Sequence, residues 1–139
     1  MIAKMNIPVY KPDLSGKEKE YINQCLDTSW ISSRGKFVDR FEAEFETYLG
    51  EVKATTVSNG TVALHLALYA LGIGKGDEVI LPSLTYVASA NAVAYVGAKP
   101  VFADSNIDTW NLDLKSVVSK ITPKTKAIMA VHLYGNPCD

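Results

Sequence analysis

The stretch ATTVSNGTVALHLAL, residues 54–68, decides the fold of this chain. It places Ser-Asn-Gly-Thr between β-branched residues and a strongly apolar segment. Asn59-Gly60 is the strongest short-range signal for a β-hairpin, but a hairpin needs a second strand of alternating apolar and polar residues. Residues 61–71 instead consist mostly of good helix formers, with no Pro or Gly before Gly72. The stretch therefore predicts a strand over 54–57, a tight corner, and a helix over 61–71.

Apolar side chains surround this predicted helix on more than one face. Leu64, Leu68 and Leu71 share one face, while Leu66 and Tyr69 lie on others. A helix that is apolar all round is typically buried, so we expect a buried helix here. His65 in its interior is accordingly interpreted as a core histidine.

Composition narrows the class of protein. The chain has 139 residues, 47% apolar and 21% charged, which is typical of a globular domain. A net charge of −1 argues against a nucleic-acid or anionic-lipid partner. We expect no membrane span and no secretory signal, and hence a cytoplasmic protein. The two cysteines and two histidines have no metal-ligand spacing, so no metal site is expected.

Helix and strand patterns alternate along the chain. A Ser15–Glu18 capping box predicts a helix to about residue 27, with a buried stripe of Tyr21, Ile22, Cys25 and Leu26. A second helix is expected over 37–49, ended by Gly50. Further strands are predicted over 78–81, 100–103 and 127–132, with helices over 86–96 and 114–119. This alternation predicts an α/β fold with a parallel sheet. We divide the chain into an N-terminal helical segment, 1–50, and an α/β segment, 51–139.

Polar residues follow the predicted strands. Ligands of open parallel sheets bind beyond the carboxyl ends of the strands, and these ends share one edge. The segments just past those ends are 58–61, 83–86, 104–105 and 132–135. Three of them contain the Gly, Ser, Thr, Tyr or His that a binding site needs.

Two of these segments suggest a cofactor. The free N–H groups at the start of the helix after Asn59, with Gly60 and the Thr61 hydroxyl, suit a single phosphate group. The alternative is that these residues only cap the helix. Tyr86 is either a core aromatic or a flat platform at the same edge. A phosphate cradle together with a stacking ring matches pyridoxal phosphate.

Three longer stretches carry a family resemblance. VSNGTVALHLAL (57–68), GDEVILPSLTYVASANAVAYVGAKPVFAD (76–104) and ITPKTKAIMAVHLYGNPCD (121–139) closely resemble the DegT/DnrJ-type pyridoxal-phosphate sugar aminotransferases. The similarity runs in register over about residues 7–139. It implies the large domain of a fold-type-I aminotransferase, a mostly parallel sheet flanked by helices, of which this chain is an incomplete N-terminal portion. It also implies that strand 54–57 lies at the far edge, away from the other strands of this chain.

The resemblance implies roles for individual residues. Gly60 and Thr61 fall where the family binds the cofactor phosphate, and Tyr86 falls where an aromatic ring stacks on the pyridine. The N-terminal residues that approach the sugar nucleotide are Tyr10, Trp30, Ser32 and Ser33. His132, Tyr134 and Asp104 receive no catalytic role.

No lysine of the chain matches the catalytic lysine of the family. We therefore expect the Schiff-base lysine to lie beyond Asp139, and no catalytic residue in this portion. The implied reaction is amination at C4 of GDP-4-keto-6-deoxymannose with L-glutamate, by a homodimer. The alternatives are a related sugar dehydratase, an aminotransferase for a UDP- or dTDP-linked keto sugar, and a non-enzymatic binding module.

Overall fold

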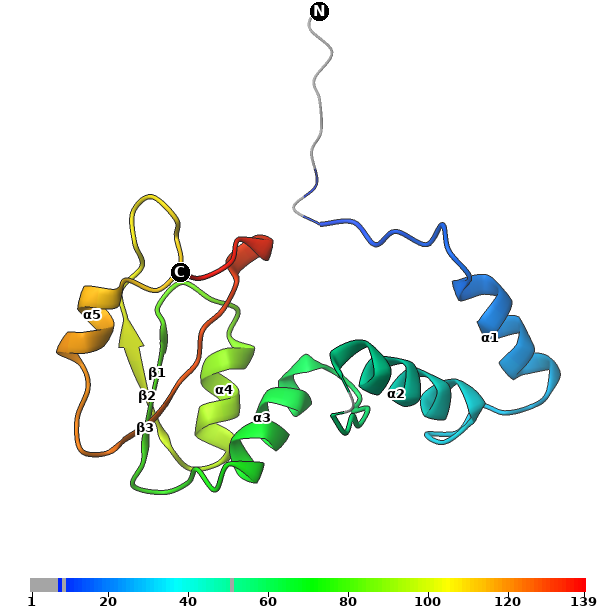
Figure 1. The fold of residues 1–139 in the computed structure, drawn as a ribbon, viewed down its shortest axis with the longest axis horizontal. Helices are drawn as coiled ribbons and strands as arrows, with labels where there is room; N and C mark the ends of the chain where they lie inside the picture. The colour runs from blue at the N-terminus through cyan, green and yellow to red at the C-terminus, as the bar shows by residue number, and fades with distance from the viewer. Residues whose placement is uncertain (1–7, 9, 51) are drawn as a thin grey trace, which may run out of the picture. The chain divides into compact units, whose positions relative to one another are not determined.

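The computed structural model describes residues 8, 10–50 and 52–139. The chain divides into two compact units, one ending at Thr56 and the other beginning at Val57 (Figure 1). The first contains helices α1 (Glu18–Asp27) and α2 (Lys36–Leu49). The second contains α3 (Gly60–Ala70), β1 (Glu78–Pro82), α4 (Ala88–Tyr95), β2 (Lys99–Ala103), α5 (Leu114–Ser119), β3 (Thr125–Ile128) and the 3-10 helix η1 (Leu133–Gly135). The domain boundary at residue 50 stays a prediction.

The second unit is built on a three-stranded parallel sheet of order β2-β1-β3, which confirms the predicted parallel α/β class. The central strand β1 pairs with β2 from Glu78 opposite Lys99 to Pro82 opposite Ala103. All five residues of β1 are buried. A parallel strand covered on both faces needs a nearly continuous apolar run, here residues 79–82, which explains why this segment shows no alternation.

Neighbouring side chains of β1 enter two separate cores. Val79 packs on one face with residues of α3 and α4, among them Leu68 and Val93. Ile80 packs on the opposite face with Val117 of α5. Helices therefore cover both faces of the sheet, with α4 and α5 on opposite sides (Figure 1).

The predicted strand over 54–57 does not form among the described residues, and this prediction is wrong for the chain by itself. The N–H of Ala54 donates to Oε1 of Glu46 (3.1 Å), and the N–H of Thr56 donates to Oε1 of Glu42 (2.6 Å). A strand exists only through its ladder of backbone bonds, and here carboxylates of α2 take two of the donors instead.

Helix α3 forms almost where predicted, but it is not buried all round. Leu68 is buried, whereas Val62, Leu66 and Tyr69 are exposed. Within the described residues α3 packs chiefly on α4, so only one face is covered. His65 is half-buried, with its ring edge-on to Tyr95 and the ring centroids 5.7 Å apart, rather than in the core.

The predicted capping box at the start of α1 is wrong. The helix begins at Glu18 after Lys17, without a side-chain cap, and the N–H of Ser15 donates to Oδ1 of Asp13 (3.0 Å). The predicted buried stripe is only partly covered, because Ile22 and Leu26 are exposed and Tyr21 and Cys25 are half-buried.

The other boundaries agree more closely with prediction. Helix α2 ends at Gly50, which is left-handed with φ of 85°. Helix α5 spans the predicted 114–119 and is capped by Asp113, whose side chain accepts from the N–H of Ser116. Helix α4 is shorter than the predicted helix over 86–96. Strand β3 begins and ends earlier in the sequence than the predicted strand over 127–132. No helix in the described part of the chain is long and apolar enough to cross a membrane.

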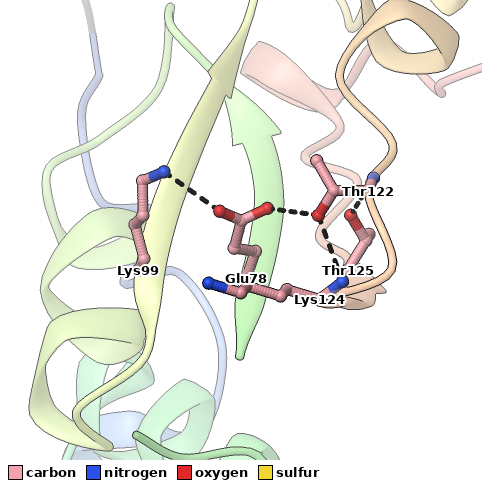
Figure 2. A network of polar contacts seen from close by, with 5 residues as sticks. All are labelled: Glu78, Lys99, Thr122, Lys124 and Thr125. Carbon is pink, nitrogen blue, oxygen red and sulfur yellow. Dashed lines mark hydrogen bonds and ion pairs between the residues drawn. The ribbon is translucent and has the colours of Figure 1, made fainter. Parts of the chain in front are cut away.

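Glu78 joins the amino ends of all three strands (Figure 2). Its Oε1 accepts from Nζ of Lys99 (3.0 Å), and its Oε2 accepts from Oγ1 of Thr122 (2.7 Å). Its own N–H donates to the carbonyl of Lys124 (2.8 Å). The hydrogen bond from Thr122 and then the bond from Lys99 lower the pKa of Glu78 below its ordinary value, against the opposing effect of burial.

Glu78→Gln should lower the free energy of unfolding at neutral pH, because an amide carries no charge for Lys99 to stabilise. Since the folded state lowers the pKa of Glu78, the contribution is complete above the ordinary pKa of a glutamate and is lost as the pH falls through the lower pKa of the folded state. Urea denaturation at several pH values should therefore show a difference between wild type and variant that shrinks on acidification. Glu44→Gln, which alters an exposed pair with Arg40, is the control. A difference that persists unchanged into strong acid would contradict this account.

Candidate functional site

The carboxyl ends of β1, β2 and β3 share one edge of the sheet, as parallel strands require. A pocket of about 440 Å³ lies beyond these ends, and its lining residues are Leu84, Thr85, Tyr86, Trp110, Val131, His132, Leu133 and Tyr134. The structure thus brings together two of the predicted segments, 83–86 and 132–135. Asp104 and Ser105 do not line this pocket.

Tyr86 stands at the surface of this pocket, with 77% of its area exposed. The loop that carries it is tied to the start of α4 in two places. Oγ of Ser89, which is buried, pairs with Oγ1 of Thr85 at 3.0 Å, and the N–H of Ser89 donates to the carbonyl of Tyr86 (3.1 Å). The Tyr86 ring is therefore exposed on an anchored backbone and is not a core aromatic of this unit.

Trp110 is a pocket residue that sequence reasoning missed. It belongs to the connection between β2 and α5 and is 58% exposed. Its backbone is left-handed, with φ of 65°, and that of Tyr134 across the same pocket has φ of 51°. Bulky residues rarely adopt this region, and such strain gathers at functional sites. The only sequence signal was a tryptophan in the segment that follows a strand end.

His132 has a defined partner within the chain. Its Nδ1 accepts from the N–H of Cys138 at 3.0 Å, and Sγ of Cys138 donates to the carbonyl of Val131 (3.2 Å). These bonds close a loop around η1. His132 therefore stabilises the pocket wall through Nδ1. The described residues contain no group of histidines, cysteines and carboxylates that could hold a metal ion.

The start of α3 is a second polar feature of this unit. The side chain of Asn59 accepts from the N–H of Val62 (3.0 Å), so Asn59 caps the helix, as the alternative interpretation of this segment expected. Among the described residues, the N–H groups of Gly60 and Thr61 have no hydrogen-bond partner. A Cβ at Gly60 would meet nothing within 4 Å beyond its chain neighbours and the backbone of its own helix, so the space beside Gly60 is open. Neither residue lines the pocket at Tyr86.

The N-terminal candidates lie in the first unit and are described within it. Trp30 and Ser32 line a pocket of about 650 Å³ together with Arg34 and Lys36. Ser33 does not line it, and Tyr10 is 84% exposed and takes no part in it. The indole N–H of Trp30 donates to the carbonyl of Arg34. Thr28 and Asp39 also line the pocket, which thus combines aromatic rings, two hydroxyls, two cations and a carboxylate, groups suited to a sugar.

Comparison with known proteins identifies the family. Residues 12–139 match the DegT/DnrJ/EryC1/StrS aminotransferase family. The chain belongs to this family. The match extends over nearly all of the described residues and includes both polar features of the second unit. It agrees with the resemblance carried by the sequence motifs.

Two curated relatives are highly similar to the chain. It is 62% identical over 133 residues to the GDP-perosamine synthase of Escherichia coli O157:H7, and 57% identical over 133 residues to that of Vibrio cholerae. In each case the match covers 96% of this chain and 36% of the relative. The chain therefore spans about a third of the length of the curated relatives it matches.

Solved structures of aminotransferases share the fold. The sugar aminotransferase Spr1654 of Streptococcus pneumoniae, solved in its PMP form, superimposes with a TM-score of 0.86 at 37% identity. That match covers 97% of this chain and 34% of Spr1654. NtdA of Bacillus subtilis, solved with bound PMP, gives a TM-score of 0.80 at 35% identity, over 87% of this chain and 28% of NtdA. The large-domain fold of these enzymes is thus present here in part.

Gly35→Ala should disturb the pocket of the first unit, because a Cβ at Gly35 would fall on the indole ring of Trp30. We expect the variant to displace Trp30 and to destabilise the first unit by about 1–3 kcal/mol, the usual cost of overpacking. Quenching of tryptophan fluorescence by acrylamide and a urea titration would measure both effects. Gly16→Ala is the matched control, since its nearest neighbour is the flexible Glu18 side chain. An indole equally accessible in both variants would contradict the packing described here.

Proposed function

We propose that this chain supplies the cofactor phosphate site and a cofactor-stacking platform of a pyridoxal-phosphate-dependent aminotransferase. The substrate proposed is a nucleotide-linked 4-keto-6-deoxy sugar, namely GDP-4-keto-6-deoxymannose, with L-glutamate as amino donor and GDP-perosamine as product. The observation that carries the proposal is the 56–62% identity to three GDP-perosamine synthases over 96% of the chain. A surface polysaccharide such as O-antigen is the proposed destination of the product.

The residues at the start of α3 fit a phosphate. The N–H groups of Gly60 and Thr61 point out of the helix with no partner among the described residues, where the helix dipole places about half a positive charge. The absence of a side chain at Gly60 leaves room for phosphate oxygens. Thr61 adds a hydroxyl donor. These residues bind and orient; they carry out no bond-making step.

Tyr86 is the proposed stacking platform. Its ring is exposed and its backbone is anchored. Such a ring suits a flat aromatic ligand, because two aromatic rings can stack with an offset. When bound, pyridoxal phosphate supplies an electron sink for proton transfer at the amino-bearing carbon. Tyr86 contributes to that chemistry by holding the ring in one plane. The lysine that moves the proton is proposed to lie outside this chain, since none here matches the family position.

The pocket of the first unit is proposed to receive the sugar nucleotide. Trp30 offers a face to the sugar ring, and Ser32 offers a hydroxyl. Arg34 and Lys36 also line the pocket and suit the pyrophosphate. Ser33 and Tyr10 remain proposed substrate contacts although they do not line this pocket. A cytoplasmic homodimer with small-molecule substrates is the proposed form of the enzyme.

Loss of the Thr61 hydroxyl should weaken cofactor binding by the full-length protein. Thr61→Ala is expected to cost about 1–3 kcal/mol of binding free energy, the value of a hydrogen bond to a charged group. Tyr86→Ala should cost about 0.5–1.5 kcal/mol beyond the lost contact area. Equilibrium dialysis against pyridoxal phosphate measures both. Thr61→Ser and Tyr86→Phe keep the hydroxyl and the ring and should bind as wild type does. Unchanged affinity in both alanine variants would mean that the cofactor edge lies elsewhere.

Nucleotide choice separates the proposed substrate from its alternatives. Offered GDP-, UDP- and dTDP-linked 4-keto-6-deoxy sugars in competition with L-glutamate, the full-length enzyme should turn over the GDP-linked sugar fastest. Preference for a UDP or dTDP sugar would reject the GDP assignment and keep the aminotransferase. Loss of a sugar hydroxyl without gain of an amine would show a dehydratase and reject both.

A further inference from the structure

Asn111 lies next to the pocket residue Trp110 in the chain, and the proposed function gives it no role. It is one of few buried polar residues among those described, with 3% of its area exposed. It follows Trp110 directly, and its side chain reaches across to the segment that contains Tyr134. A buried amide is costly unless every polar atom finds a partner, so the partners of Asn111 show what it holds.

Every partner of the Asn111 side chain lies in one distant segment. Its Nδ2 donates to the carbonyls of Asn136 (3.0 Å) and Pro137 (2.9 Å), and its Oδ1 accepts from the N–H of Leu133 (3.3 Å). These residues are 22 to 26 positions further along the chain. The amide thus clamps both ends of the short turn 133–137, where η1 lies.

A second asparagine, Asn136, forms a hydrogen bond in the opposite direction between the same two segments. Nδ2 of Asn136 donates to the carbonyl of Thr109 (3.0 Å), so the two segments are joined in both directions. Trp110 lies between Thr109 and Asn111, and Tyr134 lies inside the clamped turn. Both aromatic residues have a left-handed backbone, which needs surrounding contacts to persist. The paired asparagines provide those contacts beside both strained positions.

We propose that Asn111 is a positioning residue of the pocket at Tyr86. Through the turn 133–137 it holds Tyr134 and Trp110 in strained conformations, so that they form the wall of the pocket that Tyr86 also lines. This proposal rests on the proposed function, because it assigns that wall to the space beside the bound cofactor ring. Asn111 itself does not line the pocket and acts through the turn it clamps.

Asparagine is the residue this position requires. Two donations and one acceptance are made by a single planar group. An aspartate would keep the acceptor for Leu133 but would place negative oxygen against two carbonyls. An alanine would leave the carbonyls of residues 136 and 137 and the N–H of residue 133 without these partners. The alanine substitution therefore removes three hydrogen bonds to the turn and not a single one.

Hydrogen–deuterium exchange and cofactor binding test the proposal in the full-length protein. Asn111→Ala should speed hydrogen exchange at the backbone amides of Gly135, Asn136 and Cys138. None of these N–H groups donates to Asn111 itself. It should also weaken binding of pyridoxal phosphate about tenfold, the equivalent of roughly one well-made hydrogen bond. Asn136→Ala, which removes a bond from an exposed side chain, should move both readouts in the same direction and covers the case in which Asn111→Ala does not fold.

Asn106→Ala is the matched control. Asn106 lies in the same connection, but its side chain accepts only from Asp108 and Thr109 nearby. It should leave exchange in 133–138 and cofactor affinity close to wild type. Faster exchange with unchanged cofactor affinity in the Asn111 and Asn136 variants would overturn the inference alone, since the clamp would then be purely structural. A wild-type protein that binds no pyridoxal phosphate would overturn the proposed function and this inference with it.

Discussion

Burial of the strand Glu78–Pro82 is the constraint on which the second unit depends. All of its residues are buried, and its neighbours in the sheet are both parallel to it. Val79 and Ile80 point into different cores, so one strand requires helices on both faces. Parallel strands in turn require each connection to cross back over a face. The carboxyl ends of the three strands therefore meet at one edge, and the polar segments that follow them converge there.

The amino ends and the carboxyl ends of the strands in this sheet differ in structure. At the amino ends, Glu78 accepts hydrogen bonds from both Lys99 and Thr122 and so joins the three strands (Figure 2). At the carboxyl ends, the exposed rings of Trp110 and Tyr134 lie on left-handed backbone beside the hydrogen bonds of Asn111 and Asn136. The exposed groups therefore lie at the carboxyl ends of the strands, where ligands bind in open parallel α/β sheets.

Sequence reasoning succeeded where a pattern is local and failed where it depends on partners. The strand at EVILP and the glycine at position 50 are local signals, and each predicted its element well. The strand at 54–57 failed because no neighbour for it is present among the described residues. The same reason leaves much of α3 exposed, although its composition is that of a buried helix.

The candidate site shows the same contrast between features with a local signal and features that depend on distant partners. Tyr86, His132 and Tyr134 were placed at one edge from strand order alone, and the pocket contains all three. Trp110 and Asn111 were missed. They lie in a long connection after a strand, and such a connection has no periodic pattern from which the position of each side chain can be predicted. Asn111 is recognisable only once its partners 22 to 26 residues away are known.

The central claim is that the start of α3 and the ring of Tyr86 together hold pyridoxal phosphate. A crystal structure of the full-length protein with this cofactor tests it most directly. The account predicts phosphate oxygens within hydrogen-bond distance of the N–H groups of Gly60 and Thr61, and the pyridine ring stacked on Tyr86. A phosphate bound away from Gly60 and Thr61, or a pyridine ring with no contact to Tyr86, would contradict it.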